Sequence, residues 1–161
     1  MGHRTGRTAA GARGAVAGAI ATGAMSVVME AGRRVTAFRR QPPELIVRTL
    51  LTGDPQRPVG GEDALALLAH FGYGTSFGGL FGLLTHRSGR AGTQLGVGYA
   101  LLLWLISYAG WVPAAGILAP PGRDDAGRQL ALVGGHVVYG AVLAVVLRRL
   151  LRDRSQVREA A

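Results

Sequence analysis

The sequence predicts an all-α fold, a polytopic membrane protein whose four transmembrane helices form one bundle and one domain. Of the 161 residues, 48% are hydrophobic and 17% are charged, below the roughly 25% typical of a soluble domain. The charged residues gather at the ends and in the connections, and they leave four long uncharged runs between them. Because a helix needs about 20 mainly apolar residues to cross a bilayer, these runs predict four crossings.

The four predicted spans differ in composition. The first is rich in alanine and glycine, and it is the least hydrophobic. Trp104, Tyr108 and Trp111 crowd the second half of the third span, as in the aromatic belt at a membrane surface. Pro113 ends that span, and Pro120 begins the loop after it. The spans are placed at about residues 14–31, 64–85, 94–113 and 130–148.

The first connection, residues 32–63, is the long one, and it is predicted to lie on the non-cytoplasmic side. Within it, QPPELIVRTLLTG predicts a short helix, since Pro43 suits a first helical position and Glu44 the positive end of the helix dipole. Its leucines fit a membrane surface, with Arg48 towards water. The alternative is a helix packed against the end of the bundle.

Arginine supplies every one of the 18 basic residues, and the formal net charge is +9. Ten arginines would lie on the side of the two termini and eight on the other side. This bias predicts that both termini are cytoplasmic, with 149–161 as a basic tail facing an anionic cytoplasmic leaflet. Arg33, Arg34, Arg39 and Arg40, directly after the first span, argue against that orientation. Nucleic acid is not expected as a partner, because the arginines flank apolar spans.

Small residues recur every fourth position in three of the spans. Residues four apart share a helix face, and small residues in membrane helices mark places where a second helix packs closely. The sequence therefore predicts helix contacts at six glycines. They are Gly14, Gly18, Gly74, Gly78, Gly82 and Gly140.

The pattern His-x-x-Tyr-Gly occurs twice, at residues 70–74 and 136–140. Each histidine lies on a small-residue face, about six residues inside the start of its span. Equal depth predicts a polar cluster near the non-cytoplasmic side, and the repeat suggests two parallel helical hairpins. The predicted cluster consists of Glu30, His70, Tyr73, Tyr108, His136 and Tyr139.

This cluster has three interpretations. Neutral histidines can hydrogen-bond across helices and fix their packing. Alternatively, histidine changes charge near neutral pH, so the cluster would respond to protons. Two histidines and a glutamate would also make a three-ligand metal site, the interpretation favoured least. No metal and no cofactor is therefore predicted.

Recognisable catalytic motifs are missing from the sequence: it has no HExxH, no GxSxG, no Walker lysine and no cysteine. The expected function is accordingly structural or regulatory, in a membrane protein that is not an enzyme. The alternative is a component of an oligomeric transporter or channel, with a homo-oligomer as its partner, since four short helices leave little room for a private pore.

Taken in order, RRQPPE, the first HxxYG motif, WVP at 111–113 and the second HxxYG motif form a pattern over residues 14–148. This pattern resembles the YagU-like group of small bacterial inner-membrane proteins of unknown function. The resemblance implies a helical protein of the bacterial inner membrane. It supplies no catalytic residues to carry over to this chain.

Overall fold

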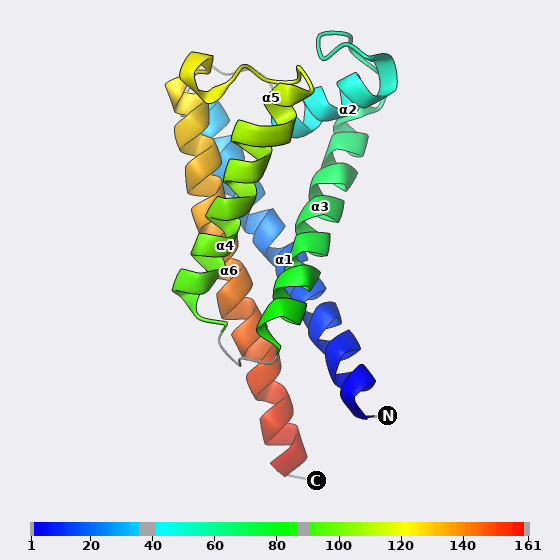
Figure 1. Cartoon of the computed structure of the whole chain (residues 1–161), viewed down its shortest axis with the longest axis vertical. Helices are drawn as coiled ribbons and strands as arrows, with labels where there is room; N and C mark the ends of the chain where they lie inside the picture. The colour runs from blue at the N-terminus through cyan, green and yellow to red at the C-terminus, as the bar shows by residue number, and fades with distance from the viewer. Residues whose placement is uncertain (1, 36–40, 87–90, 160–161) are drawn as a thin grey trace.

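A computed structural model shows an all-helical chain (Figure 1). It describes residues 2–35, 41–86 and 91–159, with the backbone alone for 2–5 and 153–159. No strand occurs in these described ranges, which confirms the predicted all-α class. The elements are α1 (Gly2–Val35), α2 (Pro42–Thr52), α3 (Glu62–Thr85), α4 (Thr93–Ile106), the π-helix η1 (Ser107–Trp111), α5 (Val112–Ala114), the 3-10 helix η2 (Pro121–Arg123) and α6 (Ala126–Glu159).

Three helical stretches are long and apolar enough to cross a membrane: Gly6–Val35, Thr93–Ala114 and Ala126–Arg152. They contain the first, third and fourth predicted spans. The second predicted span, 64–85, is helical as α3 but is not among the three. Its glycines and polar residues lower its mean hydropathy, so four crossings remain a prediction.

Both ends of the chain extend the helices beyond the predicted spans. α1 begins at Gly2, and α6 continues through 149–159 of the predicted tail, while residues 160–161 lie outside the described ranges. Both termini lie at one end of the bundle, and α2 lies at the other (Figure 1). Arg39 and Arg40, which argue against the predicted orientation, are also outside the described residues.

Glycines bring α1 and α3 into close antiparallel contact. A Cβ atom on Gly78 would lie 2.5 Å from the Cα of Gly18, and one on Gly82 would lie 3.0 Å from the Cα of Gly14. Real Cβ atoms are essentially never found as close as 2.5 Å to another atom. The backbones of α1 and α3 therefore approach this closely only because Gly18 and Gly78 have no side chain. Further along the same contact, Gly74 packs against the side chain of Thr22.

The second helical pair, α4 and α6, is joined in a similar way. A Cβ atom on Gly140 would lie 2.7 Å from the Cα of Val97, and Gly96 faces the same stretch of α6. Thus all six glycines predicted at helix contacts lie at such contacts. The last residue of each HxxYG motif packs against the preceding long helix, but the two-hairpin repeat itself remains a prediction.

Helix α6 also packs along α1, where Gly135 faces Met25 and Met29 and Gly32 faces Ala131. By contrast, α3 and α4 stand apart in front of α1 (Figure 1). They meet through long side chains, since the ring of Phe81 lies 5.0 Å from that of Tyr99. The described contact between α3 and α4 is thus made by aromatic side chains rather than by closely packed backbones.

The third predicted span changes its helical geometry near its end. In η1 the N–H of Val112 donates to the carbonyl of Ser107, five residues back, and Gly110 has a non-helical backbone. Pro113 has no N–H to donate to residue 109, so a regular helix cannot continue through this turn. Such single-turn π segments are often found at functional sites.

Helix α2 forms where the sequence predicts a short helix, with a proline at its start and Gly53 in a left-handed conformation at its end. The expectation that Arg48 faces water is wrong. Arg48 is buried and pairs with Glu62 at the start of α3, because that carboxylate compensates its charge. The first turns of α2 therefore pack on the bundle, while Leu50 and Leu51 remain exposed.

Candidate functional site: a cavity at the α2 end of the bundle

A cavity of about 210 Å³ lies between α1, α3, the α4–η1 segment and α6, beneath α2. Its walls are mostly carbon, contributed by residues such as Met25, Ile46, Phe77 and Leu132. No aspartate, glutamate or arginine is found among its described lining residues. A site of this kind suits a neutral, largely apolar molecule.

Five of the six predicted cluster residues line this cavity, so the structure brings side chains from α3, η1 and α6 together. In helical terms, His70 and Tyr73 are one turn apart, as are His136 and Tyr139, which points each pair to one side of its helix. The five residues are His70, Tyr73, Tyr108, His136 and Tyr139.

Glu30 does not line the cavity, so its predicted place facing the two histidines is wrong. Its carboxylate accepts hydrogen bonds from Arg33, at 2.8 Å and 2.9 Å, and from Arg34, at 2.9 Å. These arginines are three and four residues further along α1, the spacing at which side chains of opposite charge meet on a helix surface. Glu30 therefore belongs to an ion-pair cluster at the end of α1.

The tyrosine hydroxyls at the cavity are engaged with other parts of the bundle. Tyr139 donates to the carbonyl of Gly74 at 2.7 Å and so ties α6 to α3. Across the mouth of the cavity, the Tyr73 hydroxyl lies 3.0 Å from the Ser107 hydroxyl and links α3 to η1. These bonds support the structural interpretation of the tyrosines.

The histidines have fewer partners. Nδ1 of His136 lies 2.8 Å from the carbonyl oxygen of Leu132, one turn earlier in α6. Because a carbonyl can only accept, Nδ1 carries the hydrogen, and Nε2 of the neutral ring is left as an acceptor. His70, which also lines the cavity, has no hydrogen bond to another described residue. The site therefore contains ring nitrogens with unused hydrogen-bonding capacity.

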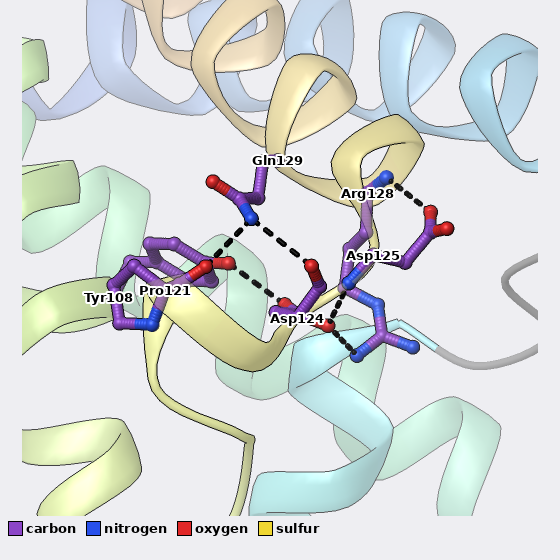
Figure 2. Close-up of polar contacts among 6 residues, drawn as sticks. All are labelled: Tyr108, Pro121, Asp124, Asp125, Arg128 and Gln129. Carbon is purple, nitrogen blue, oxygen red and sulfur yellow. Dashed lines mark hydrogen bonds and ion pairs between the residues drawn. The ribbon is translucent and has the colours of Figure 1, made fainter.

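Figure 2 shows the polar contacts that the connection before α6 makes with Tyr108 and with the start of α6. Asp124, whose side chain is 4% exposed, accepts from the Tyr108 hydroxyl at 2.8 Å and from Nη1 of Arg128 at 2.9 Å. Nε2 of Gln129 donates to the carbonyls of Pro121 and Asp124. This network fixes Tyr108 against the start of α6.

Helix α2 is held over the cavity by the ion pair between Arg48 and Glu62. Nε of Arg48 donates to Glu62 Oε2 at 2.8 Å, Nη2 donates to Oε1, and the N–H of Val59 also donates to the carboxylate. The hydrogen bonds from Arg48 and then Val59 lower the pKa of the Glu62 carboxyl. On the same helix, burial raises the pKa of Glu44.

Both tryptophans of the chain line the cavity, which the sequence did not predict. The Trp104 ring stacks on Tyr108, with centroids 5.5 Å apart, and Trp111 is at the more exposed edge. These rings were predicted to belong to an interfacial belt. The available signal was their spacing, since Trp104, Tyr108 and Trp111 recur at four and three residues and therefore share one helix face.

Metal binding finds no support in the described part of the chain, where no group of three or more histidine, aspartate or glutamate side chains is placed to hold an ion. Glu30, the third ligand that a metal site would need, is paired with arginines. What the cavity offers is an apolar space with a few neutral hydrogen-bonding groups.

The fold and the site define a class of all-helical proteins with membrane-compatible helices around an apolar cavity. The chain belongs to the family of unknown function DUF6789, which it matches over residues 8–157. That match does not name the YagU-like group, so the resemblance to it stays a prediction. No curated protein and no solved structure matches the chain.

Proposed function

We propose that the chain is a four-span integral membrane protein that binds a small neutral molecule in the cavity at the α2 end of its bundle. The role is one of binding or regulation rather than catalysis. The observation that carries this proposal is the cavity of about 210 Å³, which has an uncharged lining and contains both motif histidines. Apolar pockets with a few convergent polar groups are the usual form of small-molecule sites.

Helix α3 has the length and the surface that a fourth crossing requires. Its 24 residues would extend about 36 Å at 1.5 Å per residue, more than the hydrocarbon thickness of a bilayer. Its outer face carries exposed leucines such as Leu68 and Leu84, and its inner face packs on α1 through glycines. This packing alongside a candidate membrane span supports a crossing by α3.

The closeness of α1 and α3 favours a binding site over a passage. Below the cavity, the two backbones meet from Gly74 to Gly82 on α3 and from Gly14 to Thr22 on α1. From the cavity-lining pair Thr22 and Gly74 towards the termini, this contact closes the α1–α3 side of the bundle. A transporter or channel component, the alternative function, would need further chains to provide a path.

The arginine bias supports a bacterial inner membrane with both termini in the cytoplasm and the α2 end on the other side. The resemblance to the YagU-like group supports the same location. In that orientation the cavity opens in the outer half of the bilayer.

Topology tests the number of crossings. Four crossings put the termini on one side, whereas three crossings, without α3, put them on opposite sides. Reporter fusions at the N-terminus, at the C-terminus and in the 53–61 linker should therefore report one side for both termini and the other for the linker. Termini on opposite sides would reject the four-span arrangement.

Binding is tested by the thermal stability of the purified chain in detergent. A neutral probe such as naphthalene should raise the midpoint of unfolding, because a ligand that binds the folded state stabilises it. The variant Ala69→Phe puts a large ring at a position that lines the cavity, and it should lose this response, whereas Leu68→Phe on the exposed face should keep it. An equal response in both variants contradicts binding in the cavity.

A further inference from the structure

The hydrogen-bonding groups of the cavity restrict what it can hold. His136 donates its Nδ1 hydrogen to Leu132, and the lone pair of Nε2 has no partner among the described residues. His136 is only partly buried and lines the cavity, so this nitrogen is available to a molecule bound there. An accessible acceptor in an apolar site selects for a ligand that can donate.

The nearby groups make the site suitable for one hydroxyl. His70 has a free ring N–H in either neutral tautomer, and it lines the same cavity as His136. A hydroxyl can donate to Nε2 of His136 and accept from His70 at the same time. The hydroxyls of Tyr73 and Ser107 bond to each other, which engages one of their two donor hydrogens.

In the proposed four-span arrangement, the exposed side of the cavity faces the bilayer. Tyr73 of α3 and Trp111 of η1 line the cavity and are 38% and 42% exposed. Leu102 and Ile106 of α4 are exposed as well. A molecule dissolved in the membrane would therefore reach the cavity sideways.

We infer that the ligand is a neutral, membrane-soluble molecule with an apolar body and one hydroxyl group, which is bound through His136. This inference rests on the proposed function, and it adds the chemical class of the ligand. A carbonyl or ether of the same size can accept from His70 but cannot satisfy the acceptor on His136. A water molecule could satisfy the same histidines, and then the hydroxyl of a ligand would bring no advantage.

The two tryptophans provide a direct measurement, because bromine quenches tryptophan fluorescence on contact. The experiment uses the full chain with Trp111→Phe and excites tryptophan selectively, because Trp104 in the cavity wall is then the only tryptophan. The probes are a medium-chain alcohol brominated at its far end and the methyl ether of that alcohol. The two differ in the donor hydrogen, and the ether keeps the acceptor oxygen.

The alcohol should quench Trp104 saturably and bind about fivefold more tightly than the ether, the effect of one additional hydrogen bond. This preference should disappear in His136→Phe and persist in His86→Phe, the same change at an exposed histidine outside the cavity. If His136→Phe does not fold, the ratio of the alcohol and ether affinities in the Trp111→Phe chain tests the inferred ligand class by itself.

The remaining outcomes separate the two proposals. Equal affinities for alcohol and ether would overturn the inferred ligand class, while saturable binding would still support a ligand cavity. Linear, unsaturable quenching by both probes would overturn the ligand cavity, and the inferred class with it.

Discussion

Tyr139, in the second HxxYG motif, donates a 2.7 Å hydrogen bond to the backbone carbonyl of Gly74, the last residue of the first motif. The two motifs are therefore in direct contact, although 65 residues separate this tyrosine from this glycine. Tyr139 is buried, and Gly74 is simultaneously packed against Thr22 of α1. The contact joins α1, α3 and α6 just beside the cavity.

Tyr139→Phe should destabilise the bundle, because it removes the donor and leaves the ring in place. We expect a loss of about 0.5–1.5 kcal/mol, the usual net contribution of a hydrogen bond, and membrane helices average near the lower limit. Tyr73→Phe should cost less, since its bond to Ser107 is exposed. Thermal unfolding in detergent measures both, and a larger loss for Tyr73→Phe would contradict the importance of the Gly74 contact.

Gly78→Ala should destabilise the chain strongly, because the added methyl group would meet the backbone of Gly18 and force α1 and α3 apart. The matched control is Gly72→Ala in the same helix. A Cβ atom there meets nothing within 4 Å, so the midpoint of unfolding should stay unchanged or rise slightly. Equal effects of the two variants would show that the predicted crossing does not limit stability.

The helices and their glycine contacts were accessible to sequence analysis because both depend on short-range regularities. Runs without charge locate α1, α3, α4 and α6, and a step of four residues selects one face of each helix. For the same reason five members of the polar cluster could be chosen from their depth and face alone. The π-helix at 107–111 was not predicted, although Gly110 and Pro113 indicate an irregular turn.

Glu30 and Arg48 show where the same reasoning fails. Each was placed by its position along a helix, Glu30 facing the histidines and Arg48 facing water, without a search for an ion-pair partner. Glu30 has Arg33 and Arg34 within one turn, a signal that the sequence contains. Arg48 pairs with Glu62, which is 14 residues away across a turn-rich linker, so only the fold reveals this pair.

The ion pair of Glu62 with Arg48 should make stability depend on acid pH. The folded pKa of Glu62 lies below its ordinary value of 4.5, so the folded chain binds this proton less tightly than the unfolded chain does. The stabilisation by this ion pair is therefore complete above pH 4.5, and it is lost as the pH falls through the lower pKa of the folded chain. Glu62→Gln should lower the midpoint of unfolding at pH 7 and weaken its decline between about pH 5 and pH 3.

Glu44→Gln is the matched control, because the pKa of Glu44 is shifted in the opposite direction to that of Glu62. Burial raises the folded pKa of Glu44, so its contribution to stability is present below pH 4.5 and is lost as the pH rises through the folded pKa. Glu44→Gln should consequently leave the protein at pH 7 as stable as the parent chain or more stable. The sign assignment is wrong if Glu44→Gln and Glu62→Gln shift the pH 7 midpoint in the same direction.

Asp124 should be the most sensitive residue in the connection before α6. Its two carboxylate oxygens accept from different donors, Oδ2 from the Tyr108 hydroxyl and Oδ1 from Arg128. In Asp124→Asn one of these positions becomes an NH₂ group that faces a donor, so the substitution loses a bond and adds a repulsive contact. We expect a loss of about 1–3 kcal/mol, as for a buried group deprived of its partner.

Asp125→Asn provides the comparison that makes this prediction specific. Oδ1 of Asp125 accepts from the backbone N–H of Arg128 at the start of α6, a role that asparagine fills equally well. Its midpoint of unfolding should match that of the parent chain. Because Tyr108 lines the cavity, Asp124→Asn should also weaken the stabilisation by naphthalene, whereas Asp125→Asn should not. A destabilised Asp124→Asn variant that still gains full stabilisation from naphthalene would show that this network supports the fold without shaping the cavity.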